Sequence, residues 1–257
     1  MELSPVFLAH GSPFTIFEKS EFTAFLNRFG QKVRPKAIVI FSAHFERPVT
    51  TVAATDDVHD MVYDYYGFSP EFYQVQYPAR GSTIVASIVE ERLRKRGIPV
   101  ERRYRGIDHG VFPIMMHAYP EADIPIVPVS VNPFLPAEMQ FAVGEALKGL
   151  DRDGILVIGS GFLTHNFNEI DMRPDAPPRA WAVEFTDWIR DKVLARDIES
   201  LLNYESLAPH ARKAVPRPEH FVPLLIALGS SLGDRSPRVL YDEPIKHGSM
   251  SNLSFQF

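Results

Sequence analysis

The chain has 257 residues, of which 45% are hydrophobic and 23% are charged, and its formal net charge is −5 at pH 7. Its basic residues are scattered, so it carries no positive patch of the kind that binds nucleic acid or an anionic membrane. It has no cysteine, which excludes disulfides and cysteine-ligated metal sites. No apolar run approaches the roughly 18–20 residues of a membrane span, and the N-terminus does not resemble a secretory signal. We expect a cytoplasmic protein.

Short apolar runs alternate with longer amphipathic stretches along the chain, which is typical of an α/β protein. The runs predict strands at 5–10, 37–44, 50–54, 124–131 and 154–161. The amphipathic stretches predict helices at 20–33, 82–97, 136–150 and 177–197. No internal repeat or linker interrupts this pattern. We predict one domain over residues 1–257, an αβα sandwich whose central sheet is mostly parallel or mixed.

The predicted strands at 5–10 and 37–44 each end at a histidine, His10 and His44. The strands at 37–44 and 154–161 are almost continuously apolar, which indicates burial on both faces. In such sheets ligands bind beyond the carboxyl ends of the strands, and His10, His44 and the loop after Gly159 all fall there. Imidazole is the commonest protein ligand for metals. We therefore predict that His10 and His44 are metal ligands rather than satisfied core histidines.

A third ligand is expected from the segment that reads Arg217-Pro218-Glu219-His220-Phe221. Proline followed by an acidic residue is typical of a helix start, and an apolar run follows. One interpretation makes Glu219 a helix-dipole residue and His220 a surface residue. The other makes His220, or alternatively Glu219, complete the metal's ligand set.

Two further histidines are candidates for acid–base chemistry. His165 ends the segment GSGFLTHN, which matches neither a dinucleotide-binding nor a Walker motif. We interpret it as a general base, or as a metal ligand when substrate is absent. His109 follows Asp108, which is a candidate to orient it. His109 is either a substrate-binding or acid group, or a structural residue. The sequence contains neither G-x-S-x-G nor H-E-x-x-H.

Five short motifs in order resemble the class III extradiol ring-cleavage dioxygenases, the superfamily of the protocatechuate 4,5-dioxygenase beta subunit. They are HGSP, SAHFE, DHG, GSGFLTHNF and PEHFVPLL. Residues 63–68 (YDYYGF), residues 77–79 (YPA) and the C-terminal HGSMSNLSF are similar to the DOPA 4,5-dioxygenase branch. The resemblance covers nearly the whole chain.

The resemblance implies a single αβα domain around a mononuclear non-haem Fe(II) centre. His10 and His44 match the two histidine ligands of the superfamily, and His220 matches the third ligand of this branch, where the wider superfamily has a glutamate. Glu219 remains the alternative. His165 matches the catalytic base, which in zinc-loaded members closes the ligand shell as a fourth ligand. His109 matches a histidine beside the polar groups of the substrate.

The implied reaction opens a catechol with O2 and places both oxygen atoms in the product, a muconate semialdehyde. Fe(II) is the expected active metal. Zn(II) binds such a nitrogen set more tightly than Fe(II) but has no redox chemistry, so a protein purified with zinc is expected to be inactive. Expected partners are the catechol and O2, and a homo-oligomer is possible. The branch usually reads GFP where this chain has Gly67-Phe68-Ser69-Pro70, so the catechol stays unassigned.

Two other functions fit the same residues. One is a zinc-dependent hydrolase in which His165 is the base for a metal-activated water. The other is a metal-binding interaction protein without enzymatic activity, because the Memo family resembles this fold.

Overall fold

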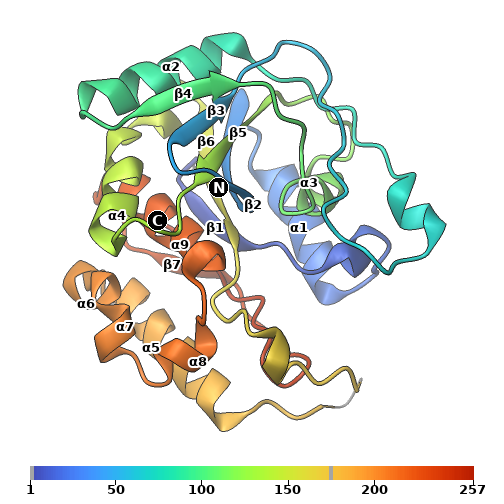
Figure 1. Ribbon diagram of the computed structural model, residues 1–257, viewed down its shortest axis with the longest axis vertical. Coiled ribbons are helices and arrows are strands. Elements are labelled where there is room, and N and C mark those ends of the chain that lie inside the picture. The colour runs from blue at the N-terminus through green and yellow to red at the C-terminus, as the bar shows by residue number, and fades with distance from the viewer. Residues whose placement is uncertain (1–2, 174–175) are drawn as a thin grey trace.

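The computed structural model describes residues 3–173 and 176–257, which form one α/β domain around an eight-stranded sheet (Figure 1). The strands follow one another across the sheet in the order β4-β3-β5-β2-β6-β1-β8-β7. Their bounds are β1 Val6–Ala9, β2 Ala37–Glu46, β3 Thr50–Ala53, β4 Val100–Arg103, β5 Ile126–Val131, β6 Ile155–Gly161, β7 Arg238–Tyr241 and β8 Ser254–Gln256. The predicted fold class is confirmed.

The four central strands β5, β2, β6 and β1 are parallel, and the strands on both sides of them make the sheet mixed. On one side β3 pairs with β5 in the antiparallel direction, and on the other side β8 runs antiparallel to both β1 and β7. Because the central strands share one direction, their carboxyl ends meet at one edge of the sheet. That edge receives the histidines.

Helices cover both faces of the sheet. Their bounds are α1 Glu21–Lys32, α2 Thr83–Lys95, α3 Phe112–Ala118, α4 Ala137–Ala146, α5 Ala180–Leu194, α6 Ile198–Leu202, α7 Tyr204–Leu207, α8 Ala211–Ala214 and α9 Val222–Ser230. Short 3₁₀ helices include η1 Pro13–Ile16, η2 Pro70–Tyr73, η3 Leu150–Asp153, η4 Phe167–Glu169 and η5 Pro218–His220.

Successive side chains of β2 point to opposite faces of the sheet and pack into two separate layers of the core. Ile38 and Ile40 pack with α1 and α3 on one face, whereas Val39 and Phe41 pack with α2, α4 and α9 on the other. Helices α5 to α8 form a further layer against α9 and β8, which Figure 1 shows in orange at the lower left. The predicted burial of β2 on both faces is confirmed.

Local signals in the sequence placed the helix starts accurately. Ser20 caps α1 by accepting a hydrogen bond from the Thr23 amide, and Ser82 caps α2 by accepting one from the Val85 amide. The helix predicted over 177–197 is shorter than expected, at Ala180–Leu194.

Other features of the fold also differ from the prediction. Strands β4, β7 and β8 were not predicted, because they are short and β4 and β7 carry the polar residues typical of sheet edges. The strand containing His44 continues to Glu46 through an irregular register with β5. The helix expected to start at Pro218 is a 3₁₀ turn, and α9 begins at Val222.

The glycines of the GSG segment let η5 and α9 approach β6 closely. A Cβ atom added at Gly161 would lie 2.1 Å from the carbonyl oxygen of His220, and one added at Gly159 would lie 2.1 Å from that of Pro223. The Phe162 amide donates a hydrogen bond to the His220 carbonyl, at 2.9 Å. These glycines therefore position the segment that carries His220.

Within the two described ranges, no helix combines the length and the apolar character needed to cross a bilayer.

Substitution of Gly161 tests this close approach. Gly161→Ala should lower the free energy of unfolding by about 1–3 kcal/mol, because the added methyl overlaps backbone that cannot rotate away. Gly144→Ala is the matched control, since its Cβ would lie 2.1 Å from the Ile226 carbonyl in the α4–α9 contact, away from η5. Urea denaturation should show a loss in both variants, and only Gly161→Ala should also weaken metal binding. Wild-type stability of Gly161→Ala would contradict the packing described.

Candidate metal centre

Three histidines from separate parts of the chain bring their Nε2 atoms together. His10 directly follows β1, His44 lies near the end of β2 and His220 ends η5. The Nε2 atom of His44 lies 3.3 Å from that of His10 and 3.2 Å from that of His220. His10 and His220 are buried and His44 is half-buried. The interpretation of His220 as a surface residue is therefore wrong.

Hydrogen bonds at the other ring nitrogen fix the tautomer of each of these histidines. The Ser160 hydroxyl donates its proton to the Gly110 carbonyl, so it accepts from Nδ1–H of His10, at 3.0 Å. A carboxylate accepts from the other two: Asp64 Oδ2 lies 3.1 Å from Nδ1 of His44, and Glu219 Oε1 lies 2.9 Å from Nδ1 of His220. In the neutral rings each Nε2 atom therefore carries a lone pair, and Nε2 of His44 faces both of the others.

Lone pairs this close repel one another unless a cation lies between them. Burial and the neighbouring imidazoles hold the pKa of His10 and of His220 well below the usual histidine range. Burial lowers the pKa of His44, but the hydrogen bond to Asp64 and the charges of the nearby carboxylates together outweigh it and raise this pKa. A proton on His44 would satisfy one neighbour only, because one N–H points in one direction. A metal ion satisfies all three nitrogens at once.

The spacing and the donor type both fit a transition metal. Nitrogens about 2.0–2.1 Å from a tetrahedral ion lie about 3.3–3.4 Å from one another, close to the two Nε2 separations found here. Imidazole nitrogen suits zinc, iron, copper and nickel, whereas calcium and magnesium prefer oxygen. The residues present therefore fit the kind of metal that the sequence predicted.

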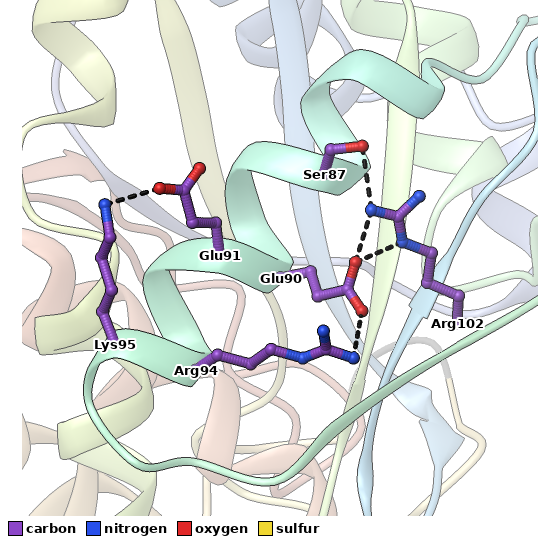
Figure 2. A pocket seen from close by; sticks show the side chains of 6 residues that line it. All are labelled: Ser87, Glu90, Glu91, Arg94, Lys95 and Arg102. Atoms are coloured by element: carbon purple, nitrogen blue, oxygen red, sulfur yellow. Dashed lines mark hydrogen bonds and ion pairs between the residues drawn. The ribbon is translucent and has the colours of Figure 1, made fainter.

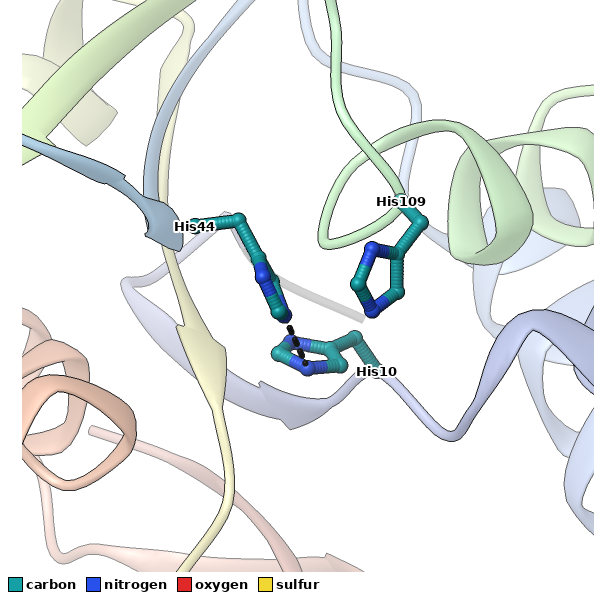
Figure 3. A group of neighbouring side chains, drawn as sticks. All are labelled: His10, His44 and His109. Atoms are coloured by element: carbon teal, nitrogen blue, oxygen red, sulfur yellow. Dashed lines mark hydrogen bonds between the residues drawn. The ribbon is translucent and has the colours of Figure 1, made fainter. Parts of the chain in front are cut away.

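His109 lies beside His44 and His10 (Figure 3). The ring centroids of His44 and His109 are 3.8 Å apart. The ligand atoms of His10, His44 and His109 all lie within 4.8 Å of one another. His109 lies in the loop before α3. The next residue, Gly110, has no side chain, which leaves room for the Ser42 hydroxyl. The structure thus places His109 in the histidine cluster.

Asp64, and not Asp108, orients His109. Asp64 Oδ1 lies 2.7 Å from Nδ1 of His109, and its other oxygen contacts His44. Burial opposes ionisation of Asp64, but the hydrogen bonds from His109 and His44 outweigh it and hold its pKa well below the usual range. Asp108 instead accepts from Ser42, at 2.6 Å, and from Arg105, at 3.0 Å. The expectation for Asp108 is wrong because a turn follows Asp108, and its side chain and that of His109 bond to different partners.

His165 lies on the other side of the cluster, stacked on His220. The two ring centroids are 3.4 Å apart and the rings are inclined by 16°. Nδ1 of His165 lies 3.4 Å from Glu219 Oε1, and the ligand atoms of His165, Glu219 and His220 lie within 4.8 Å of one another. The structure therefore brings together all five of the predicted histidines and Glu219.

The remaining histidines that carried no motif serve other purposes. The His59 and His117 rings bond to backbone carbonyls, those of Ile126 and Thr15 respectively. His210 is exposed and pairs with Glu184.

A surface depression on α2 and β4 is separate from the histidine cluster (Figure 2). Its charged groups are paired with one another, since Glu90 pairs with Arg94 and Arg102, and Glu91 pairs with Lys95. It lies at edge strand β4, whereas the histidines follow central strands. It offers no acid–base or metal chemistry.

Fold and site define an α/β protein with a histidine-rich centre able to hold a transition metal. Residues 7–253 match the family described as the catalytic LigB subunit of aromatic ring-opening dioxygenase. The chain belongs to this family, and it is an extradiol dioxygenase of the LigB type. The class of enzyme predicted from the motifs is confirmed.

Named relatives and a solved structure agree with this assignment. The chain is 35% identical to a 4,5-DOPA dioxygenase extradiol of Beta vulgaris, over 98% of this chain and 95% of the relative. It is 33% identical to a protein of the same name from Escherichia coli K12, over 98% and 93%. The crystal structure of an uncharacterized protein from Escherichia coli K12 superposes with a TM-score of 0.85 at 30% identity, covering both chains completely.

The hydrogen bond to Ser160 fixes the tautomer of His10. Substitution of Ser160 therefore tests the proposed geometry of the site without any substrate. Ser160→Ala should lower the free energy of unfolding by about 1–3 kcal/mol, because it leaves buried Nδ1–H of His10 and the Gly110 carbonyl without their partner. Ser230→Ala is the control, since Ser230 is equally buried but bonds only to the Ala227 carbonyl in its own helix. Urea denaturation of the metal-free proteins measures both. Equal, small losses would contradict the role of Ser160.

Proposed function

We propose that this chain opens catechol rings with O2 at one metal ion held by the Nε2 atoms of His10, His44 and His220. The observation that supports this ligand set is the convergence of three Nε2 atoms whose Nδ1 atoms are all engaged elsewhere. We propose Fe(II) as the active metal, and Zn(II) as a tighter-binding but inactive occupant. When bound, Fe(II) supplies the redox chemistry through which O2 reacts with a closed-shell catechol.

The remaining histidines handle protons in this proposal. Asp64 accepts a hydrogen bond from Nδ1–H of His109, and Glu219 Oε1 lies 3.4 Å from Nδ1 of His165, so in this proposal Nε2 of each ring accepts the proton. His165 takes a proton from a catechol hydroxyl as the substrate binds. His109, held by Asp64, lies beside His44 and bonds to the polar groups of the substrate. His165 returns its proton as the ring opens.

The overall reaction balances without another reductant. Catechol supplies the electrons, one carbon–carbon bond beside the diol breaks, and both oxygen atoms of O2 enter the muconate semialdehyde product. The relatives' name points to DOPA as one catechol to test.

Oxygen uptake with reconstituted protein tests the proposal. Protein loaded anaerobically with Fe(II) should consume one O2 per catechol and form a yellow ring-opened product from at least one member of a panel that includes DOPA. Zinc-loaded protein should bind metal with the same stoichiometry and consume no O2. Oxygen-independent ester or amide hydrolysis by the zinc form, with no uptake by the iron form, would select a hydrolase instead. Bound iron without any reaction would favour an interaction protein.

Replacement of His165 separates proton handling from metal binding. His165→Ala should lower kcat by about 10²–10⁴-fold, the usual contribution of a general base, and should retain one metal ion per chain. His210→Ala, at an exposed histidine paired with Glu184, is the control and should match the wild type. Metal analysis and oxygen uptake measure the two effects. Loss of the metal in His165→Ala would instead make His165 a required ligand.

A further inference from the structure

Two carboxylates occupy equivalent places on opposite sides of the histidine cluster. Asp64 contacts Nδ1 of His44 and Nδ1 of His109, at 3.1 and 2.7 Å. Glu219 contacts Nδ1 of His220 and Nδ1 of His165, at 2.9 and 3.4 Å. Each carboxylate therefore joins one proposed metal ligand to one histidine proposed to handle protons.

The two oxygens of Glu219 differ in their contacts, since Oε1 contacts histidine nitrogens and Oε2 has no hydrogen-bond partner among the described residues. Oε1 faces the two Nδ1 atoms, and Oε2 lies 3.5 Å from an Nη atom of Arg217. Arg217 is in turn held by both oxygens of Glu46 on β2. Glu219 is buried, with the Nδ1 atoms of His220 and His165 on one side and the charge of Arg217 on the other.

Asp64 lies in a loop and not on one of the strands that carry the histidines. It lies in the loop between β3 and η2, and it also accepts from the backbone amide of His109, at 3.2 Å. It therefore holds the loop of His109 against β2, which carries His44. The two histidine pairs thus come from different parts of the chain, and in each pair one carboxylate contacts both rings.

We propose that Asp64 and Glu219 are positioning residues, each fixing the ring orientation and tautomer of one metal ligand together with one proton-handling histidine. The inference rests on the proposed function. Its physical basis is that a carboxylate accepts hydrogen bonds only, so both imidazoles it contacts must present Nδ1–H and keep Nε2 free. Each proton-handling ring is then set at a fixed place relative to the metal it serves.

The test compares Asp64→Asn, Glu219→Gln and a matched control, Glu90→Gln. Glu90 is also a buried carboxylate with two partners, but these are Arg94 on α2 and Arg102 on the edge strand β4. Zinc affinity is measured by competition with a chelator. Imidazole N–H resonances of the zinc form are followed by NMR, and kcat and KM are measured with saturating Fe(II).

We expect zinc affinity to fall about 10–100-fold in both site variants and to stay unchanged in Glu90→Gln. Glu219→Gln should shift the N–H resonances of His220 and His165 and leave those of His44 and His109 in place, and Asp64→Asn should do the reverse. With saturating Fe(II), kcat should fall while KM changes little. Unchanged resonances in a folded variant would overturn the proposal, and so would resonances that shift on both sides at once.

A second variant covers the case in which Glu219→Gln does not fold. Arg217→Met removes the partner on the far side of Glu219 at a half-exposed position, and it should give the same pattern of resonance shifts with a smaller loss of affinity. No shift at His220 and His165 in this variant would overturn the role of Glu219. If both site variants lose zinc affinity as expected but wild-type protein opens no catechol, the proposed function fails and the positioning of the metal ligands stands.

Discussion

The site depends on how three imidazoles are held together, with Nε2 of His44 lying 3.3 Å from that of His10 and 3.2 Å from that of His220. Such an arrangement is repulsive until a cation lies between the rings, so the surrounding protein must prevent them from turning away. Ser160, Asp64 and Glu219 do this by accepting from the three Nδ1–H groups. The cost of this arrangement is recovered only when the metal binds, which explains why so many polar groups are buried at one edge of the sheet.

The fold supplies this constraint through its parallel centre and its glycines. Strands β1 and β2 deliver His10 and His44 to the same edge because they share a direction with β6, which lies between them. His220 is not on a strand, and it reaches the other two only because Gly161 lets η5 lie against β6. A side chain at this glycine would move the third nitrogen away from its partners. The apolar core therefore serves the site by fixing backbone, and the polar contacts fix the rings.

Much of the fold and the set of histidines could be predicted from the sequence, because short-range signals determine both. The alternation in β2 and the serine caps of α1 and α2 are local, and each site histidine has a recognisable neighbourhood. The partners of the histidines could not be predicted in this way. Asp64 meets His109 across 45 residues, through a loop with no regular structure, whereas Asp108 was a candidate only because it is adjacent. Position in the sequence does not show where a loop side chain points.

The account's central claim is that the metal lies between Nε2 of His10, Nε2 of His44 and Nε2 of His220. Anomalous diffraction from crystals of the iron- or zinc-loaded protein tests it most directly. We predict a single anomalous peak within bonding distance of these three nitrogens, with Glu219 bonded to Nδ1 of His220. A metal bonded to a Glu219 oxygen, or a peak centred between His10, His44 and His109 without His220, would contradict the account.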